Sequence, residues 1–409
     1  MREFRSVVYL VMLLMIFSAR GQSVSSVYSN NGIGLINYQG LPHNSGMGEV
    51  GIAVPSIWNM NYQNPAFLPL NGITMFQVGL ETDRRKIVSE AVDGRKVTGG
   101  LRYLNLSMPV LNGKWSTALG ITPYSTVNNK TYSVGTVDAD INTETQYEGS
   151  GGITSFNWSN GFRLNKNLYA GLRSSFLFGA IEDSENSVIV DGSGSYTVNF
   201  KDRSSYSGFK LDIFLGYRKS IGETRALNFG LAYELGTTLT GLHDQTMETS
   251  VLAERLILKN EDIDFSLPSS LCFGSSFQVL NKLTIGGDFQ WTNWSSAGEK
   301  GDDFRNTIKV GFGAELVPNF SSVNNYFERV AYRFGVNFGE LPYTVNGNRI
   351  SEVGINFGGS LPVGVSNMDL AFKYGRLGTL NNDLVRETYF RIVIGASIND
   401  RWFIKRRYD

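Results

Sequence analysis

The two histidines, His43 and His243, are the side chains with the most obvious capacity for catalysis or metal binding in this sequence. Neither stands in a His-x-x-x-His or Glu-x-x-His pattern, so the spacing does not predict a zinc site. A serine hydrolase would have to build its Ser/His pair from one of them, and His243-Asp244 lies in a segment expected to be an exposed loop. The glycines of residues 354–359 are not a phosphate loop, because no helix follows them. We predict no enzyme activity, no catalytic residue, no metal site and no cofactor.

A second set of candidates consists of isolated charges in segments that otherwise alternate apolar and small residues. If the apolar side chains contact lipid, these charges point into the lumen of a barrel. One interpretation is a set of internal ion pairs around a plug. The other is that some of them line a polar substrate route, or bind a substrate carboxylate through Arg or Lys. The expected lumen charges are Arg173, Lys210, Asp212, Glu234, Asp288, Lys309, Glu315, Arg333, Glu352, Lys373 and Arg391.

The first residues indicate export. Arg2 and Arg5 precede an apolar run over residues 7–17, and Ala19 and Gly21 stand where a signal peptidase reads small residues. A membrane anchor is the alternative, but this run is too short for a bilayer core, which needs about twenty apolar residues. We therefore expect residues 1–21 to be a signal peptide and the mature chain to begin at Gln22.

Composition narrows the remaining classes. Lys plus Arg and Asp plus Glu both number 37, so no net charge recruits nucleic acid. A single cysteine, Cys272, excludes an intramolecular disulfide framework. Glycine is abundant at 46 residues, with 26 Phe and 19 Tyr but only 10 Pro. This mixture is typical of a large, curved β structure.

From Gly72 onward the chain alternates with a period of two residues. Val330, Tyr332 and Phe334, for example, alternate with Ala331 and Arg333. Runs of about ten residues suit tilted strands that cross a bilayer, although a soluble β protein also gives alternation. We predict an all-β fold, a transmembrane antiparallel barrel over residues 71–409. Its fourteen strands are expected near 72–82, 99–109, 113–123, 152–164, 167–180, 204–219, 224–236, 265–279, 282–294, 304–316, 326–340, 347–361, 366–376 and 386–398.

The connections between these strands are expected to alternate in length. Short turns would lie at one end of the barrel, and long polar loops over residues 124–151, 181–203 and 237–264 at the other. In bacterial barrels short turns face the periplasm and long loops face outward. Both ends of the barrel fall on the short-turn side, so we expect both in the periplasm.

The segment before the first strand, residues 22–70, has no strand-length alternation. It is either disordered in the periplasm or folded as a plug inside the lumen. Its apolar residues are too many for a solvated tail, which favours the plug. These residues are Ile52, Ala53, Val54, Ile57, Trp58, Met60 and Phe67.

Two short motifs in this segment resemble a known family. The run His43-Asn44-Ser45-Gly46-Met47-Gly48, followed by Asn64-Pro65-Ala66 before the first strand, is similar to the N-terminal hatch of FadL-type hydrophobic-compound channels. The resemblance implies a hatch followed by fourteen strands, with Ser45, Gly46, Met47, Gly48, Asn64, Pro65 and Ala66 in the hatch or along the substrate path. In that family a kink in the third strand opens the wall sideways, which would place Pro123 near a lateral gate. Pro123 alternatively only ends its strand, because proline cannot donate to the ladder.

The leading functional hypothesis is an outer-membrane channel for passive uptake of small hydrophobic molecules, either long-chain fatty acid-like or aromatic. The alternative is a plugged FadL-like barrel that acts as a docking or shuttle subunit of a protein-secretion machine. A structural barrel without a transport role is the third hypothesis. The expected partners are the lipid bilayer of the outer membrane, a small hydrophobic ligand and, for the alternative, a secretion-machine protein. No nucleic-acid partner is expected.

Overall fold

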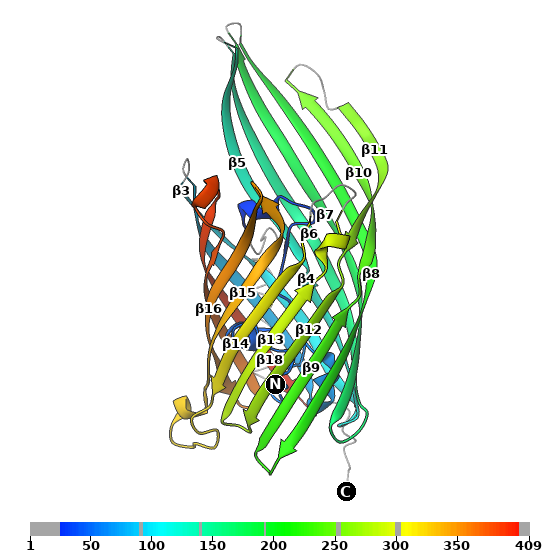
Figure 1. The fold of residues 1–409 in the computed structure, drawn as a ribbon, viewed down its shortest axis with the longest axis vertical. Helices are drawn as coiled ribbons and strands as arrows, with labels where there is room; N and C mark the ends of the chain where they lie inside the picture. The colour runs from blue at the N-terminus through cyan, green and yellow to red at the C-terminus, as the bar shows by residue number, and fades with distance from the viewer. Residues whose placement is uncertain are drawn as a thin grey trace, which may run out of the picture.

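The computed structural model describes residues 25–89, 93–138, 141–191, 194–250, 255–298 and 304–400. The expected signal peptide, residues 1–21, lies outside this range. Fourteen strands form a closed antiparallel barrel, in which the last strand pairs with the first from Arg386↔Val88 to Asp400↔Thr74 (Figure 1). This confirms the predicted fold class and the predicted number of wall strands.

Eleven of the described wall strands are continuous, and three are each divided in two by a short break. The continuous strands are β2 (Thr74–Val88), β3 (Asp93–Leu111), β6 (Ile141–Arg163), β7 (Leu168–Asp191), β8 (Gly194–Ile221), β13 (Leu283–Thr292), β14 (Thr307–Leu316), β15 (Ala331–Val345), β16 (Asn348–Val363), β17 (Ser366–Leu377) and β18 (Arg386–Asp400). The divided strands are β4 (Trp115–Pro123) with β5 (Ser125–Asp138), β9 (Arg225–Glu234) with β10 (Thr237–Thr249), and β11 (Arg255–Leu267) with β12 (Ser270–Val279).

The two faces of the wall follow the alternation of the sequence. On β15, Phe334 and Val336 are 51% and 41% exposed, while Arg333 and Asn337, which flank them in sequence, are buried. The same pattern places Phe312 and Ile394 on the outside. Large apolar side chains outside and polar ones inside are the arrangement of a barrel whose solvent is lipid. The barrel is therefore of the outer-membrane type.

The lipid-facing assignment gives a direct test at Phe334. Replacing Phe334 with arginine should destabilise the inserted barrel by about 2–4 kcal/mol, because a charge near the bilayer midplane loses its hydration. The matched control Phe334→Leu keeps the face apolar and should cost much less. Urea unfolding of both variants in lipid vesicles measures the difference. Equal stability of Phe334→Arg and the wild type would show that this face does not meet lipid.

Before the wall comes the N-terminal segment, residues 25–71, which we name so throughout. It contains η1 (Val27–Ser29), the two-residue strand β1 (Leu35–Ile36), α2 (Pro42–Ser45) and η2 (Pro65–Leu70). The other short helices are η3 (Trp294–Ser296), η4 (Tyr326–Arg329) and η5 (Asn381–Asp383). None of the described helices is long and apolar enough to span a bilayer.

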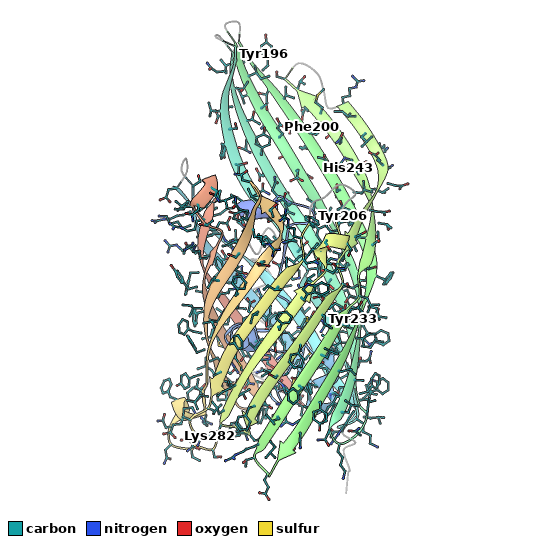
Figure 2. All side chains as sticks on the ribbon, viewed as in Figure 1. Tyr196, Phe200, Tyr206, Tyr233, His243 and Lys282 are labelled. Atoms are coloured by element: carbon teal, nitrogen blue, oxygen red, sulfur yellow. The ribbon has the colours of Figure 1, made fainter. Side chains whose placement is uncertain are left out.

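At one end of the barrel the sheet continues far beyond the wall. The prediction of long polar loops there was wrong, because hairpins β5–β6, β7–β8 and β10–β11 run as paired strands through residues 125–151, 181–207 and 237–267. We call these three stretches the extension (Figure 1). Strands β7 and β8 have 24 and 28 residues, against about ten needed to cross a bilayer. Figure 2 shows Tyr196, Phe200 and His243 on the extension and Tyr206 near its base.

The alternation of apolar residues did not predict the strands of the extension, for a physical reason. Most of its described side chains are partly or fully exposed on both faces of the sheet. Its strands therefore lack the apolar face whose alternation identifies a wall strand, and backbone ladder bonds hold them instead. The opposite end of the barrel carries the short turns and is called the short-turn end below. Lys282 marks this end in Figure 2.

Candidate functional site

The lumen is the candidate site, because the N-terminal segment crosses it and contacts strands on every side of the barrel. Helix η2 packs against β4, β6, β7 and β8, and α2 packs against β16, β17 and β18. Hydrogen bonds to Ser276 of β12 and Asp288 of β13 connect the segment to the remaining side of the barrel. The contacts explain why Ser45, Met47, Asn64, Pro65 and Ala66 are buried.

Close packing of backbone on backbone fixes the stretch around Gly46 and Gly48. A Cβ added at Gly46 would come within 2.8 Å of the Cα of Gly358 on β16. A Cβ added at Gly335 on β15 would overlap backbone atoms of Met47 and Gly48, and one at Gly313 on β14 would overlap Met47. Gly48 also adopts a φ of +72°, which favours glycine. Gly46 and Gly48 thus form one interlocking surface with the facing wall glycines, Gly313, Gly335 and Gly358.

Directly after this surface, Glu49 anchors the N-terminal segment to two wall lysines. Its carboxylate oxygens lie 2.6 Å from Lys309 Nζ on β14 and 2.9 Å from Lys373 Nζ on β17. Burial opposes ionisation of Glu49, but the two ammonium groups outweigh burial and hold the pKa of Glu49 below its ordinary value. Lys373 also pairs with Glu352 at 2.8 Å. Sequence reasoning missed Glu49, which lies outside any periodic element.

A carboxylate of the wall holds the next stretch. Asp288 on β13 accepts hydrogen bonds from the backbone N–H groups of Gly51 and Ile52, at 2.6 and 2.9 Å. On β12, Ser276 Oγ donates to the carbonyl of Ala53 at 2.6 Å. These bonds satisfy backbone groups of an irregular segment that would otherwise be buried without partners.

Asn64, Pro65 and Ala66 start helix η2. Asn64 caps it by accepting from the Ala66 N–H at 3.1 Å, and its amide donates to the Ile52 carbonyl at 2.8 Å and to the Leu215 carbonyl at 3.1 Å. Pro65 occupies the first helical position, where its missing N–H costs nothing. Asn64 therefore joins two stretches of the N-terminal segment and also binds the segment to β8.

The charges expected in the lumen all contact protein partners. Lys210 lies 2.7 Å from Asp212 and 3.1 Å from Glu234. Arg333 lies 2.6 Å from Glu315 and also contacts Ser360. Arg173 donates to the Tyr62 carbonyl and to Ser159, with its guanidinium over the Tyr62 ring at 4.6 Å. Arg391 lies 3.0 Å from Asp83.

Further lumen charges were not predicted from the sequence. Arg85 lies 3.2 Å from Asp83 and 2.5 Å from Glu387, and Arg102 pairs with Glu81. Glu387 accepts from Ser26 Oγ at 2.8 Å and from the Val27 N–H at 2.8 Å, so it anchors η1. The sequence contains a pattern that could have predicted these charges, because the two-residue period of a strand places Glu81, Asp83 and Arg85 on one face of β2.

The described wall is discontinuous at Pro123, where β4 ends and β5 begins. Strand β3 pairs with β4 from Leu111 to Leu104, and above Leu104 none of the described β3 residues pairs with β5. Figure 1 shows β3 and β5 diverging above this level. The N-terminal segment enters the gap, where β1 pairs with β5 at Leu35↔Thr126 and Ile36↔Ser125.

Polar side chains of the N-terminal segment close this gap. Gln39 Nε2 donates to the Pro123 carbonyl at 3.1 Å, and Asn37 Nδ2 donates to Thr126 Oγ1 at 2.9 Å. From the other side, Arg102 donates to the Tyr38 carbonyl at 2.7 Å. The remaining cavity has a volume of about 10 Å³, which is room for one water.

Two further spaces adjoin the N-terminal segment. A cavity of about 250 Å³ lies between it and strands β12–β15, lined by both apolar and charged residues, among them Trp294, Asp288 and Lys309. Above it, at the base of the extension, ten buried side chains pack into what we call the upper apolar cluster. Its members are Ile33, Val127, Ile153, Leu177, Ile181, Tyr206, Leu239, Phe265, Leu267 and Trp294.

A few expectations differ from the structure. Ile57 and Trp58, which the sequence suggested were buried, are 43% and 37% exposed at the short-turn end. Trp58 packs instead on Phe320, with ring centroids 5.4 Å apart.

The two histidines have different surroundings. His43 is buried in α2, where burial, aided by Arg333, lowers its pKa well below the ordinary value. His243 contacts Asp202 and Ser204 in the extension, both at 3.1 Å. Within the described ranges, no cluster of His, Cys, Asp and Glu suits a metal ion.

Comparisons with known proteins agree with the fold. A monoaromatic hydrocarbon channel, CymD, superposes with a TM-score of 0.59 at 15% identity, covering 90% of this chain and 99% of its own. The Ralstonia pickettii toluene transporter TbuX gives 0.55 at 16% identity, covering 88% and 98%. A Pseudomonas aeruginosa FadL homologue gives 0.56 at 13% identity, covering 94% and 100%.

At the level of sequence the comparison gives a different family name. No curated protein sequence matches this chain significantly. The family model named BamG matches residues 3–409, almost the whole sequence. The FadL resemblance therefore holds for the fold, while the sequence falls under another family model. The chain is a member of the BamG family, built on the fold of the FadL-type outer-membrane channels.

Proposed function

We propose that this protein is an outer-membrane channel for the passive uptake of small hydrophobic molecules, and that residues 22–70 are its plug. The observation that carries the proposal is the break in the wall at Pro123, which the N-terminal segment fills. Among the described side chains, Lys96 of β3 also reaches across it, to Asn128 Oδ1 of β5 at 2.7 Å. The solved proteins with this fold include a monoaromatic hydrocarbon channel and a toluene transporter. With both barrel ends at the short-turn end, the extension would face the cell exterior.

The proposed route runs from the extension to the side of the barrel. An apolar molecule would enter at the upper apolar cluster, whose side chains must separate to admit it. It would then pass along the N-terminal segment and leave between β3 and β5, through the gap now closed by Asn37 and Gln39. Lateral exit spares a hydrophobic molecule from crossing water, because the bilayer core lies directly outside.

A reversible crosslink across this gap tests the route. Leu35 and Thr126 are directly opposed, and opposed residues in an antiparallel pair have Cα atoms about 4.5–5.5 Å apart. That distance suits a disulfide. The double variant Leu35→Cys/Thr126→Cys should take up a fluorescent apolar probe into intact cells about tenfold more slowly when oxidised, and reductant should restore the rate.

The control is a second disulfide far from the gap. Leu283 and Leu316 are opposed on β13 and β14, so Leu283→Cys/Leu316→Cys should form a crosslink without changing uptake. Unchanged uptake by the oxidised Leu35→Cys/Thr126→Cys variant, with its disulfide verified by mass spectrometry, would show that the substrate does not leave through this gap.

A second candidate function is supported by the extension. In this hypothesis the closed barrel is a docking or shuttle subunit of a protein-secretion machine. Strands β7 and β8, with 24 and 28 residues, are more than twice as long as the roughly ten residues that a bilayer requires, and transport of a small molecule gives no reason for such length. Native mass spectrometry of protein in mild detergent separates the two: a bound lipid-like ligand supports uptake, and a stoichiometric partner protein supports docking.

A further inference from the structure

The extension is an open sheet with two edges, and these edges differ. One edge is β5 and the other is β11, because the described β11 pairs with β10 along its length and otherwise only bridges Gly298 through Ser266 at its base (Figure 1). Open edges present unpaired N–H and C=O groups, and proteins usually protect them with charges, proline or a covering segment. The protection is present on one edge and incomplete on the other.

The N-terminal segment covers only the lower part of the β5 edge. Strand β1 pairs with Ser125 and Thr126, and Asn128 exchanges bonds with η1: its carbonyl accepts from the Ser26 N–H at 3.0 Å, and its N–H donates to Ser29 Oγ at 3.0 Å. Above Asn128, no residue in the described ranges pairs with this side of β5.

The backbone repeat identifies which groups are left open. Successive residues of a strand direct their N–H and C=O groups to opposite edges. Because Asn128 bonds outward, Lys130, Tyr132 and Val134 also direct theirs outward, away from β6. Three consecutive outward positions are enough to register an added strand.

Beyond Lys130, the side chains of this edge lack the usual protection. Residues 131–137 (Thr-Tyr-Ser-Val-Gly-Thr-Val) contain no charge and no proline and have high strand propensity. Tyr132 and Val134 are 60% and 81% exposed. On β11, by contrast, Lys259, Glu261, Asp262 and Asp264 interrupt the edge with charges. The contrast within one sheet marks β5 as the edge that is left available.

Charge indicates what the edge accepts. The extension contains 15 acidic and five basic residues, and five minus 15 gives a formal net charge of −10 in a chain whose total is zero. Beside the open edge, Glu144 is the cross-strand partner of Val134, and Glu148 is the partner of Lys130. A second copy of this chain would bring another −10 to the contact, which disfavours pairing of two β5 edges.

We propose that the β5 edge, at Lys130, Tyr132 and Val134, is a strand-addition site for an extended segment of a basic polypeptide. Main-chain bonds to the three outward positions would provide affinity. Lys or Arg side chains near Glu144, in the net negative charge of the extension, would provide selectivity, whereas Glu148 already pairs with Lys130 at 3.5 Å. The site stands on the extension alone, so it holds whether or not the barrel conducts.

The test uses full-length protein in detergent and three labelled ten-residue peptides. The first alternates Lys with Val and Thr, the second has Glu in place of Lys, and the third is the Lys peptide with alternate backbone nitrogens methylated. Fluorescence anisotropy should show binding of the first peptide, weakened by added salt. The glutamate and methylated peptides should bind at least about tenfold more weakly. The first lacks the charge attraction and the second lacks the main-chain hydrogen bonds.

Two matched variants locate the binding. Val134→Pro removes an outward N–H without removing a bond to β6, and should weaken binding of the Lys peptide about tenfold. Ile257→Lys places a charge on the other edge, at a residue that is 50% exposed, and should leave binding unchanged. Heat-modifiable migration in gels verifies that each variant is folded.

Four outcomes would overturn the proposal. Equal binding to Val134→Pro and wild type would place the peptide elsewhere. Equal binding of the methylated peptide would exclude strand addition, and equal binding of the glutamate peptide would exclude the charge selectivity. Disulfide crosslinking of two Tyr132→Cys chains in dilute detergent would identify a second copy as the occupant instead.

Discussion

Replacing Glu49 with glutamine should change a closed barrel into one that opens repeatedly in planar bilayers. Glu49 compensates both Lys309 and Lys373, at 2.6 and 2.9 Å, and its own side chain is only 4% exposed. Removing one partner from a buried ion pair leaves an uncompensated charge and costs about 3–5 kcal/mol. This cost falls on the contact between the N-terminal segment and the wall, because Glu49 belongs to the first and the lysines to the second. The strands themselves keep their ladder bonds, so the variant should still insert.

Two further variants make the test specific. Asp93→Asn removes an acid from the exposed pair with Lys86, 3.0 Å apart, and should leave the barrel closed because exposed pairs contribute little. Glu49→Gln combined with Lys309→Met removes the lysine whose ion pair is lost, while Lys373 keeps Glu352 at 2.8 Å, and should restore part of the closed time. Single-channel recording measures all three. A Glu49→Gln barrel as silent as wild type would show that this anchor does not hold the pore closed.

The wall was predictable because lipid and lumen impose opposite demands on neighbouring residues. Arg333 and Phe334 are adjacent in sequence, yet one is 6% and the other 51% exposed. This difference in exposure between neighbouring residues repeats every two residues, so the alternation can be recognised in a single sequence. Some lumen contacts also follow from register. Glu315 and Arg333 are direct cross-strand partners on β14 and β15, and the two acids that contact Lys210, Asp212 and Glu234, are cross-strand partners on β8 and β9.

Contacts between the N-terminal segment and the wall were not predictable in this way. Glu49 meets Lys373 across 324 positions of the chain, and no periodic pattern links an irregular segment to a strand. The family resemblance placed Gly46 and Gly48 in the hatch, but it did not predict that they would pack on Gly313, Gly335 and Gly358. These pairings depend on how the segment folds inside a wall that closes around it.

The extension shows the limit of reading apolar alternation as the only signal for strands. Residues 124–151 and 181–203 are largely polar and were interpreted as loops. Their Thr, Val, Tyr and Ile residues carry strand propensity without a buried face, which indicates an exposed sheet once hairpins from the wall are in register. The break at Pro123 was signalled by the proline, but its filling by Asn37 and Gln39 was not.

The central claim is that the N-terminal segment closes the pore. A barrel of fourteen strands has a lumen that must be filled by something, and the contacts of Glu49, Gly48 and Asn64 place this segment in it. Deleting residues 24–60 removes the Gly48 and Glu49 anchors, keeps Asn64 and η2, and leaves every wall strand intact. A control deletion of residues 245–258, at the tip of the β10–β11 hairpin, shortens the extension and leaves the N-terminal segment in place.

Conductance of the two deletion variants in planar bilayers is the most direct measurement. The barrel lacking residues 24–60 should show a large, steady conductance, because water and ions replace the removed segment along the lumen axis. The barrel lacking residues 245–258 should stay as closed as wild type. If the first variant inserts, shows heat-modifiable migration and remains closed, the extension or another part of the wall seals the pore, and the N-terminal segment is not the plug.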